Sequence, residues 1–371
     1  MYDPRMKKLA DVIIDHSIQL KKDEAVYIEA FDMPPEMLEV LVRKVYSVGG
    51  HALISEHSAR LLRTLHMHAD ETTYKIMEET ELEKFKRVQA YVGLRGWMNT
   101  TEESDVPADK MAMYRELYYG PVHIGWRLTK TRWVVLRWPT TAMAQNAQMS
   151  TEGFENLYFD TCTLDYGKMD MAMDPLASLM ARTDKVRIVG PGTDLSFSIR
   201  GIPVIKCSGQ MNLPDGECYT APVRNSVNGT LAYNTKSIYD GKVYENIKFR
   251  FKDGKIIEAS SSDTQNMTKL LDTDEGARYI GEFSFGLNPY VRQPMMETLF
   301  DEKISGSIHF TPGNSYDDAP NGNRSAVHWD IVLIQTKEWG GGEIYFDDVL
   351  VRKDGRFVLP ELKGLNPENL I

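Results

Sequence analysis

Residues 281–331 read GEFSFGLNPYVRQPMMETLFDEKISGSIHFTPGNSYDDAPNGNRSAVHWDI and contain two of the eight histidines of the chain. Both histidines lie in short apolar runs beside acidic residues, a pattern typical of strands. In the run SAVHWDIVLI, the two-residue period of a strand places His328 and Asp330 on one face, because side chains two apart point the same way. An imidazole and a carboxylate on one strand face supply half of a metal site.

A second histidine and a buried acid extend this pattern. The run GSIHF supplies His309, and the segment TPGNSYDDAPNGN that follows predicts a loop over the two histidines. Upstream, the apolar run RYIGEFSFG contains one acid, Glu282, whose burial is costly unless it is paired or binds a cation. A lone histidine in an apolar run is more often a hydrogen-bonded core residue than a ligand. The hypothesis of a metal site therefore depends on the three runs together.

One more acid belongs to this set of candidate ligands. The segment NLPDGECYTAP places Glu217 directly after a Pro-Asp-Gly turn, which projects a side chain from the end of the turn. The same four residues, PDGE, are also ordinary surface-turn chemistry. Glu217 is therefore a candidate ligand only in combination with the acids and histidines downstream.

Length and composition limit the class of protein. The 371 residues exceed the size at which one hydrophobic core stops growing, so two domains are expected. A net charge of −10 and the lack of a basic run favour neither a nucleic-acid nor a membrane partner. Three cysteines without CxxC spacing predict no disulfide framework and favour a reducing compartment. The N-terminal segment has no continuous apolar region, so we expect a cytoplasmic protein without a signal peptide or membrane anchor.

Residues 1–185 alternate between helical and strand-like patterns. Residues 4–20 predict an amphipathic helix, AVYIEA from Ala25 predicts a strand, and Pro34 and Pro35 open a further helix. This alternation predicts an α/β domain with a mostly parallel sheet. No GxGxxG follows the first strand and no GxxxxGK[ST] occurs, which disfavours a nucleotide cofactor.

From Val186 the pattern changes to short β-like runs separated by glycine turns. VRIVGPGTDLSFSIRG and IKFRFKDGKIIEA are examples, and the three runs with the candidate ligands follow them. We therefore expect a second domain over residues 186–371, of α+β class, rich in antiparallel strands and carrying the metal site.

Several long strings resemble the aminopeptidase T family of metallo-aminopeptidases, also called PepS or AmpS in bacteria. They are, in chain order, TRWVVLRWPTTAMAQNAQMS, VGPGTDLSFSIRG, NLPDGE, DEGARYIGEFSFGLNP, LFDEKISGSIHF, GNSY and NRSAVHWD, so the resemblance covers nearly the whole chain. It implies two adjacent divalent ions in the second domain, with a tyrosine beside them. Carried over to this sequence, the metal ligands are Glu217, Glu282, His309, His328 and Asp330, and the tyrosine is Tyr316.

The number of ligands favours two ions independently of the resemblance. Catalytic single-zinc sites use three protein ligands and one open position, so five ligands suit two ions. Three carboxylates and a bridging hydroxide would balance two dications, and that hydroxide is nucleophilic near neutral pH. One ion could take the free α-amine of a peptide, and Tyr316 could donate a hydrogen bond to the oxyanion. This chemistry predicts a metal-dependent aminopeptidase that acts on peptides with a free N-terminus.

Some features stay open on the sequence alone. The metal is zinc, cobalt or manganese, and the bridging carboxylate is not identified. Glu302 either supports the ligands from outside or pairs with Lys303, so no general base is assigned. The resemblance implies a homodimer, because relatives form homodimers.

Two alternatives belong to other classes. His309, His328 and Asp330 alone would form the two-histidine, one-carboxylate triad of non-haem Fe(II) oxygenases, and ring-cleaving dihydroxypyridine dioxygenases resemble this same fold family. The presence of both Glu217 and Glu282 favours two metals and hydrolysis instead. A scaffold that binds without catalysis is the weakest reading, because every expected ligand is present in the sequence.

Overall fold

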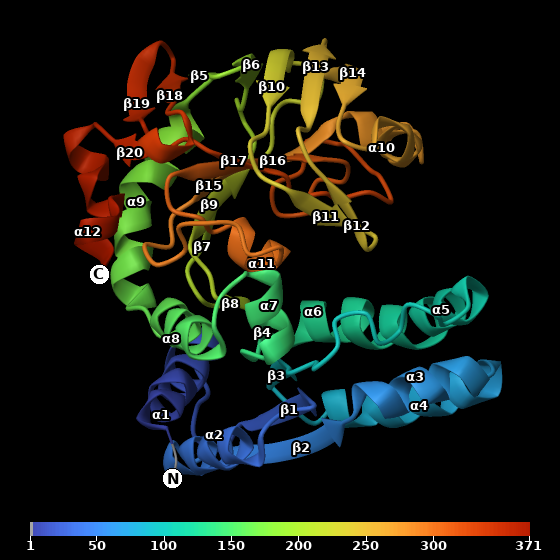
Figure 1. Cartoon of the computed structure of the whole chain (residues 1–371). Helices are drawn as coiled ribbons and strands as arrows, with labels where there is room; N and C mark the ends of the chain where they lie inside the picture. Colours follow the sequence, from blue (N-terminus) through green and yellow to red (C-terminus); the bar gives the residue numbers. More distant parts are fainter. Residues whose placement is uncertain (1–2) are drawn as a thin grey trace. The chain divides into compact units, whose positions relative to one another are not determined.

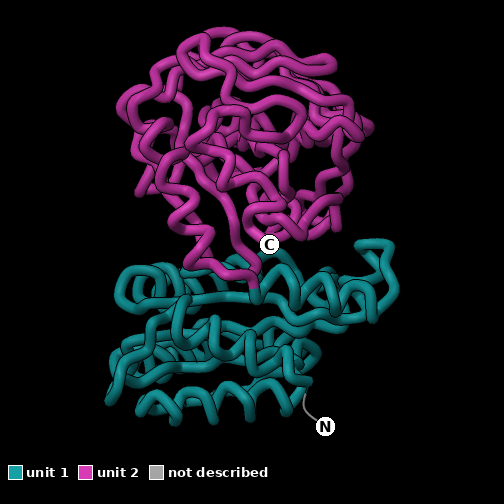
Figure 2. The backbone as a smooth tube through the Cα atoms, turned by 90° about the vertical axis from the view of Figure 1, so that its left-hand side faces the viewer, with its two compact units in different colours: residues 1–163, 209–213 teal, residues 164–208, 214–371 magenta. Residues whose placement is uncertain are grey.

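The computed structural model describes residues 3–371, which divide into two compact units (Figure 1 and Figure 2). Unit 1 comprises residues 3–163 and Gly209–Leu213, and unit 2 comprises Leu164–Ser208 and Pro214–Ile371. The chain thus enters unit 2, returns briefly to unit 1, and then completes unit 2. Each unit has its own sheets and its own buried core.

Unit 1 is built on a five-stranded sheet with the order β2-β1-β3-β4-β8, in which all neighbouring strands are parallel. This sheet confirms the expected α/β fold of the first part of the chain. Its elements are α1 (Pro4–Asp11), the π-helix η1 (Val12–Ser17), β1 (Ala25–Phe31), α2 (Pro35–Ser47), β2 (His51–His57), α3 (Ala59–His68), α4 (Glu71–Phe85), β3 (Ala90–Arg95), α5 (Ala108–Tyr114), the π-helix η2 (Arg115–Arg127), α6 (Leu128–Lys130), β4 (Arg132–Arg137), α7 (Thr141–Asn146), α8 (Thr151–Cys162) and β8 (Asn212–Leu213).

The first helix is shorter than the amphipathic pattern predicts. The α-helix ends at Asp11, the backbone continues as a π-helix to Ser17, and Gln19 adopts a left-handed φ of 45°. A left-handed residue ends a right-handed helix, so the helix expected over residues 4–20 is wrong at its C-terminal end. Leu9, Ile13 and Leu20 are nevertheless buried, as the pattern predicts, whereas Val12 is half-buried.

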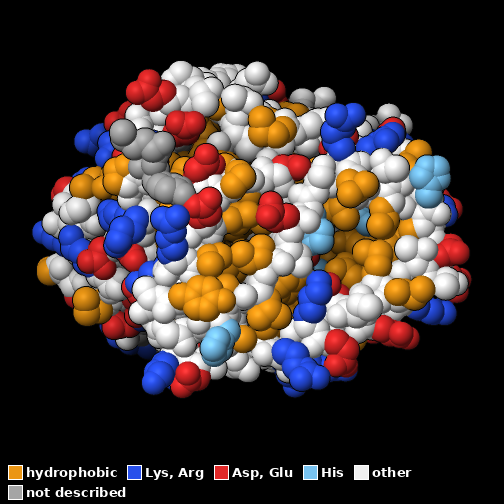
Figure 3. Space-filling model, turned by 90° about the horizontal axis from the view of Figure 1, so that it is seen from below, with side chains coloured by type: hydrophobic (Ala, Val, Ile, Leu, Met, Phe, Trp, Pro, Cys, Tyr) orange, Lys and Arg blue, Asp and Glu red, His pale blue; other side chains and the backbone are white. Residues whose placement is uncertain are grey.

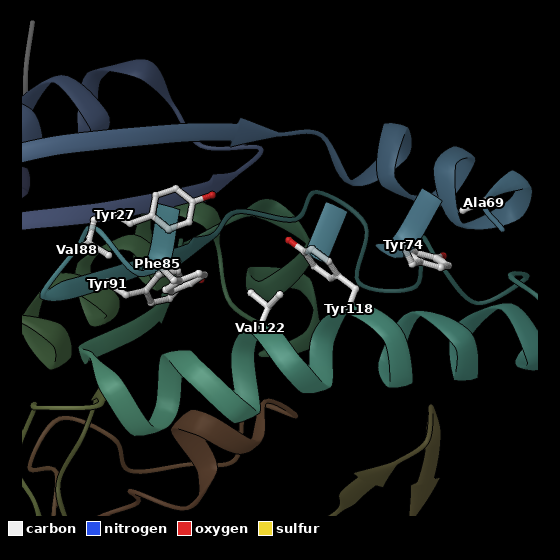
Figure 4. Packing of buried hydrophobic residues seen from close by; sticks show 8 residues of the cluster. All are labelled: Tyr27, Ala69, Tyr74, Phe85, Val88, Tyr91, Tyr118 and Val122. Atoms are coloured by element: carbon white, nitrogen blue, oxygen red, sulfur yellow. The ribbon is translucent and has the colours of Figure 1, made fainter. Parts of the chain in front are cut away.

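The core of unit 1 combines aromatic side chains from the sheet with helices that cover it. Tyr27 of β1 and Tyr91 of β3 lie against Phe85 of α4, with ring centroids 5.4 Å and 5.6 Å from Phe85 (Figure 4). Tyr118 and Val122 of η2 belong to the same cluster. Apolar residues adjacent in sequence to these strand residues are buried on the other face, as expected for a sheet covered on both sides.

Unit 2 contains α9, a large antiparallel sheet, a smaller antiparallel sheet and a hairpin. This arrangement confirms the expected α+β class of the second part. Its elements are α9 (Tyr166–Arg182), β5 (Lys185–Gly190), β6 (Thr193–Ser198), β7 (Ile205–Cys207), β9 (Glu217–Thr220), β10 (Asn228–Ala232), β11 (Ser237–Tyr239), β12 (Lys242–Tyr244), β13 (Lys248–Lys252), β14 (Lys255–Ser260), α10 (Thr264–Leu271), the 3-10 helix η3 (Gly276–Arg278), β15 (Ile280–Gly286), α11 (Thr298–Asp301), β16 (Ser307–Pro312), β17 (Val332–Ile334), the 3-10 helix η4 (Lys337–Trp339), β18 (Glu343–Phe346), β19 (Val349–Lys353), β20 (Arg356–Phe357), the 3-10 helix η5 (Pro360–Leu365) and α12 (Pro367–Leu370).

The division into units differs from the expected boundary between residues 185 and 186. Helix α9 lies before that boundary, yet it packs against β7, β9 and η5 of unit 2. Strand β8 lies after the boundary, yet it pairs with β4 of unit 1. A change in local sequence pattern marks where strands begin, whereas the packing of α9 and β8 depends on contacts distant in sequence.

The smaller sheet of unit 2 has the order β17-β16-β15-β9-β7 and is antiparallel throughout. Strand β15 lies at its centre, and all seven of its residues are buried. Strands β9 and β16 flank β15 and carry Glu217 and His309. The candidate ligands therefore lie on adjacent strands of one rigid sheet.

Two glycines shape the segments that bring the remaining ligands to this sheet. Gly216 has a φ of +126°, and a Cβ there would lie 3.1 Å from the backbone nitrogen of Asn288. Gly313 has a φ of +108°, and a Cβ there would lie only 2.0 Å from the carbonyl oxygen of Val327. A side chain at Gly313 would thus push away the segment that carries His328.

Among residues 3–371, none of the helices combines the length and apolar character that a membrane crossing requires. On the face drawn in Figure 3, Lys and Arg side chains lie among acidic and apolar ones rather than in one continuous basic patch. The net charge of the whole chain is −10.

Candidate metal centre

Glu282 lies at the centre of the candidate site. It is buried within β15, with only 3% of its surface exposed. Its Oε1 lies 2.8 Å from Nε2 of His309, and its Oε2 lies 3.4 Å from Nε2 of His328. The two oxygens of one carboxylate thus face two different imidazoles.

Glu217 and His309 complete one side of the site. Glu217 is the first residue of β9, directly after the turn, and its Oε2 lies 3.3 Å from Nε2 of His309. The Ser284 hydroxyl donates a hydrogen bond to the same oxygen at 3.1 Å. Glu217, Glu282 and His309 each offer one atom within 4.8 Å of the others, which is close enough for a single cation.

His328 and Asp330 complete the other side. Nε2 of His328 lies 3.3 Å from Oδ1 of Asp330, and these two residues form a second group with Glu282 within 4.8 Å. Nδ1 of His328 lies 2.9 Å from the carbonyl oxygen of Asn314, so this nitrogen carries the proton and donates it. Nε2 of His328 has no hydrogen-bond partner, so in the neutral ring its lone pair is available to a metal ion, which takes the place of a second proton.

The expected strand around His328 is wrong, although the expected pairing of its side chain is found. Only an isolated bridge joins His328 to Gly313, and β17 begins at Val332. Asp330 is fixed by a hydrogen bond from the Thr311 hydroxyl at 2.7 Å. The extended backbone near this bridge keeps the two side chains together without a regular ladder.

The electrostatics of the site favour positive charge. Burial alone would lower the pKa of His309, but the hydrogen bond and charge of Glu282, together with Glu217, raise it to about 9. Burial likewise opposes charge on His328, yet Asp330 and Glu282 raise its pKa well above the ordinary value. The carboxylates therefore attract cations at both imidazoles, and a metal ion satisfies the same preference that a proton does.

Glu302 lies at the edge of the same site. The sequence leaves open whether it supports the ligands or pairs with Lys303, and in the structure it lies close to both. It offers an atom within 4.8 Å of ligand atoms of His309 and Asp330, and its Oε1 lies 2.6 Å from Nζ of Lys303. Burial, opposed by the charge of Lys303, raises the pKa of Glu302 to about 8. A carboxyl group with that pKa holds a proton near neutral pH, as an acid-base group must.

Tyr316 lies beside these groups rather than within one of them. Its ring centroid is 4.7 Å from that of His328 and 5.8 Å from that of Tyr219. With 45% of its surface exposed, Tyr316 can reach a molecule that enters the site from solvent. Its position fits a hydrogen-bond donor better than a ligand.

The buried Lys303 was not identified from the sequence. Its Nζ lies 2.6 Å from Oε1 of Glu217, and the residue is fully buried. The only signal in the sequence is a lysine followed by the apolar Ile304 and a glycine-containing turn. Such a signal does not separate a buried lysine from a solvated one.

The comparisons with known proteins bear on the identity of the chain. A family model described as thermophilic metalloprotease (M29) matches residues 2–357. The chain belongs to this metalloprotease family. Membership makes it a metal-dependent peptide hydrolase and confirms the family resemblance that the sequence strings indicate.

Individual relatives agree with this membership. Aminopeptidase PepS of Streptococcus thermophilus is 23% identical, and the match covers 90% of this chain and 92% of PepS. Aminopeptidase T of Thermus aquaticus is 31% identical over a match that covers 43% of this chain and 44% of the relative. The M29 protein described here thus aligns with PepS nearly end to end and with aminopeptidase T over less than half its length.

Two solved structures share the fold. AmpT from Thermus thermophilus has a TM-score of 0.80 at 22% identity, covering 96% of this chain and 99% of AmpT. A 2,5-dihydroxypyridine dioxygenase from Pseudomonas putida KT2440 has a TM-score of 0.60 at 12% identity, covering 97% and 98%. At these identities the likeness concerns the fold alone, which therefore accommodates both chemistries.

Proposed function

We propose that this M29 protein is an aminopeptidase that uses two divalent ions, held by Glu217, Glu282, His309, His328 and Asp330. The observation that carries the proposal is the position of Glu282, whose two oxygens face different histidines. One residue shared by two groups of ligands is the arrangement expected of a carboxylate that bridges two ions. Glu282 is therefore our candidate for the bridging residue.

Each ion would have three protein ligands. The first position has Oε2 of Glu217, Oε1 of Glu282 and Nε2 of His309, and the second has Oε2 of Glu282, Nε2 of His328 and Oδ1 of Asp330. Carboxylate oxygens and imidazole nitrogens suit zinc, cobalt and manganese, so all three metals fit this donor set.

The chain supplies the remaining chemistry around the ions. Two divalent ions would provide the Lewis acidity and the activated water that hydrolysis of a peptide bond requires. Tyr316 would donate a hydrogen bond to the carbonyl oxygen of the scissile bond as negative charge develops there. Glu302 would hold a proton and pass it to the leaving amine, since its carboxyl group faces the ligands.

The dioxygenase alternative is less well supported. A triad of His309, His328 and Asp330 would need both histidines at one ion. Within residues 3–371, the groups that could hold an ion place His309 and His328 in different groups. The arrangement therefore favours two positions with one histidine each.

Assembly and location are also proposals. The relatives named above are bacterial proteins, and we propose a homodimer acting on peptides in the cytoplasm. Size-exclusion chromatography with light scattering would measure the mass of the particle against the 371-residue chain.

Metal content tests the two-ion site directly. We expect about two ions per chain in the active protein and loss of peptidase activity after dialysis against a chelator, because three ionised carboxylates and two imidazoles need two dications. Elemental analysis beside an assay on leucyl amides measures both quantities. Full ring-cleaving activity with one equivalent of bound iron, together with oxygen consumption, would support the dioxygenase instead.

End specificity tests the aminopeptidase assignment. The free amine of a peptide would be held by one of the ions or by a nearby acidic side chain, whereas an acetylated nitrogen is a poor partner for either. We expect unblocked dipeptides to be cleaved and their N-acetylated forms to be turned over at least about tenfold more slowly, since acetylation removes the basic amine. Equal rates for the two forms would contradict an aminopeptidase and point to cleavage of internal bonds.

A further inference from the structure

Lys303 is a fully buried cation that lies among the acids of the metal centre. It follows the short helix α11, and none of its surface is exposed. Its Nζ lies 2.6 Å from Oε1 of Glu217, 2.6 Å from Oε1 of Glu302 and 3.7 Å from Oδ1 of Asp215. Burying an ammonium group is expensive unless acidic groups surround it, and here the side chains of Asp215, Glu217 and Glu302 do.

The ammonium group lies where a further cation would otherwise fit. Cys207, Asp215 and Glu217 each offer an atom within 4.8 Å of the others, so they form another group that could hold an ion. Lys303 already contacts two of these three residues. This acidic corner is thus neutralised by the protein itself, beside the two positions left for metal ions.

Because of the contact with Lys303, the two carboxylate oxygens of Glu217 have different partners. Oε1 accepts a hydrogen bond from the ammonium group, while Oε2 accepts one from Ser284 and faces Nε2 of His309 at 3.3 Å. A carboxylate held at both oxygens cannot rotate freely about its last bond. Glu217 is therefore presented to the first ion by one oxygen only.

We propose that Lys303 is a positioning residue of the metal centre, which fixes Glu217 so that Oε2 alone is offered to the ion at the first position. The inference rests on the proposed two-ion site. Lys303 does not touch substrate, because it is fully buried. The orienting effect of Lys303 on Glu217 is confined to the first position, because Glu217 is not a ligand at the second position.

Two effects of removing Lys303 would act in opposite directions. Loss of a nearby positive charge would strengthen the binding of any cation, and would do so at both positions. Loss of the hydrogen bond to Glu217 would weaken binding at the first position alone. Partners that orient metal ligands typically contribute 10- to 100-fold in affinity, so we expect the loss of orientation to dominate.

The test is titration of the metal-free full chain with Co²⁺. Calorimetry and visible absorbance measure the number of ions bound and the affinity of each. We expect the wild-type chain to bind two ions and Lys303→Met to bind one of them about 10- to 100-fold more weakly, with the other bound at least as tightly as in the wild type. Lys206→Met is the matched control, since Lys206 bridges Asp170 and Asp174 at 3.0 Å and 2.6 Å but contacts no candidate ligand. It should retain both affinities.

Lys303→Met leaves buried acidic groups without their cation, so the variant could fold poorly. A second pair of variants keeps the test valid in that case. Lys303→Met combined with Glu302→Gln removes the ammonium group together with one acid that it contacts, and Glu302→Gln alone is its reference. We expect the double variant to bind one ion about 10- to 100-fold more weakly than that reference. Circular dichroism confirms that the chains compared are folded.

The outcomes separate the two hypotheses. A wild-type chain that binds fewer than two ions would refute the two-ion site itself. A wild-type chain with two ions would refute the role of Lys303 alone if the variants bind both ions as tightly as their references, or more tightly. Equal weakening at both positions would also overturn it, because that result indicates general damage to the pocket.

Discussion

Replacing Glu282 by glutamine is expected to remove both ions and to lower kcat/KM on leucyl amides by roughly 10³-fold or more. Glu282 faces both histidines, so a neutral amide in its place weakens both positions at once. Loss of the ions forfeits several kcal/mol of transition-state stabilisation, and each 1.36 kcal/mol corresponds to about a factor of ten. Elemental analysis and steady-state kinetics on the same preparation measure the two effects.

The matched control is Glu258→Gln. Glu258 also lies on a strand of unit 2 and pairs with a basic residue, Arg250, but its side chain is exposed. The control should keep two ions and wild-type kinetics. If Glu282→Gln kept two ions and nearly full activity, the bridging role would be wrong. Loss of one ion only would assign Glu282 to a single position.

The parallel sheet of unit 1 could be predicted because its central strands, β1 and β3, are buried on both faces. Runs such as AVYIEA are almost continuously apolar, and glycines or prolines separate them from amphipathic helices. These local patterns specify the type of each element and, through the handedness of crossovers, the class of sheet. They do not specify that Asn212–Leu213 returns to the sheet edge, since that strand has only two residues.

The candidate ligands could be predicted from the sequence for similar reasons. Which of them lie next to one another in the folded chain could not. An acid inside an apolar run, as at Glu282, needs a partner, which the sequence shows without identifying it. In the structure β15 and β16 pair in a continuous register in which Ser284 lies opposite His309 and Glu282 lies opposite Thr311, and the register shifts only between Ile280 and Glu282. This register brings Glu282 diagonally beside His309, and the periodicity of a single strand does not predict which residues of another strand it will pair with.

Lys303 illustrates the limit of a sequence pattern most clearly. A lysine beside a glutamate ordinarily lies on the surface, where the pair contributes little. Here Lys303 points into a site in which one of its partners, Glu217, lies 86 positions away in the sequence. Only the folded chain brings the ammonium group to the ligand it contacts.

Tyr316→Phe is expected to leave about two ions in place and to lower kcat by about 10²-fold or more. The substitution removes one hydroxyl from a residue that is not one of the five proposed ligands. Burial and the nearby carboxylates of Glu282 and Asp330 raise the pKa of Tyr316 well above its ordinary value, so the hydroxyl stays protonated and can donate. Losing one donor to an oxyanion typically costs a factor of about 10² to 10³ in kcat.

The split between kcat and metal content decides whether Tyr316 acts on the transition state. A donor used only as charge develops affects kcat and kcat/KM equally, whereas a group that merely binds substrate raises KM. Tyr345→Phe is the control, because the Tyr345 hydroxyl is likewise a hydrogen-bond donor, here to Glu343 at 2.6 Å. Tyr345 lies on β18, which is not a strand of the sheet that carries the candidate ligands. If Tyr316→Phe kept nearly full kcat, or lost activity only in proportion to lost metal, Tyr316 would not be the donor. A fall in kcat with two ions retained would leave its hydroxyl as the group that stabilises the oxyanion.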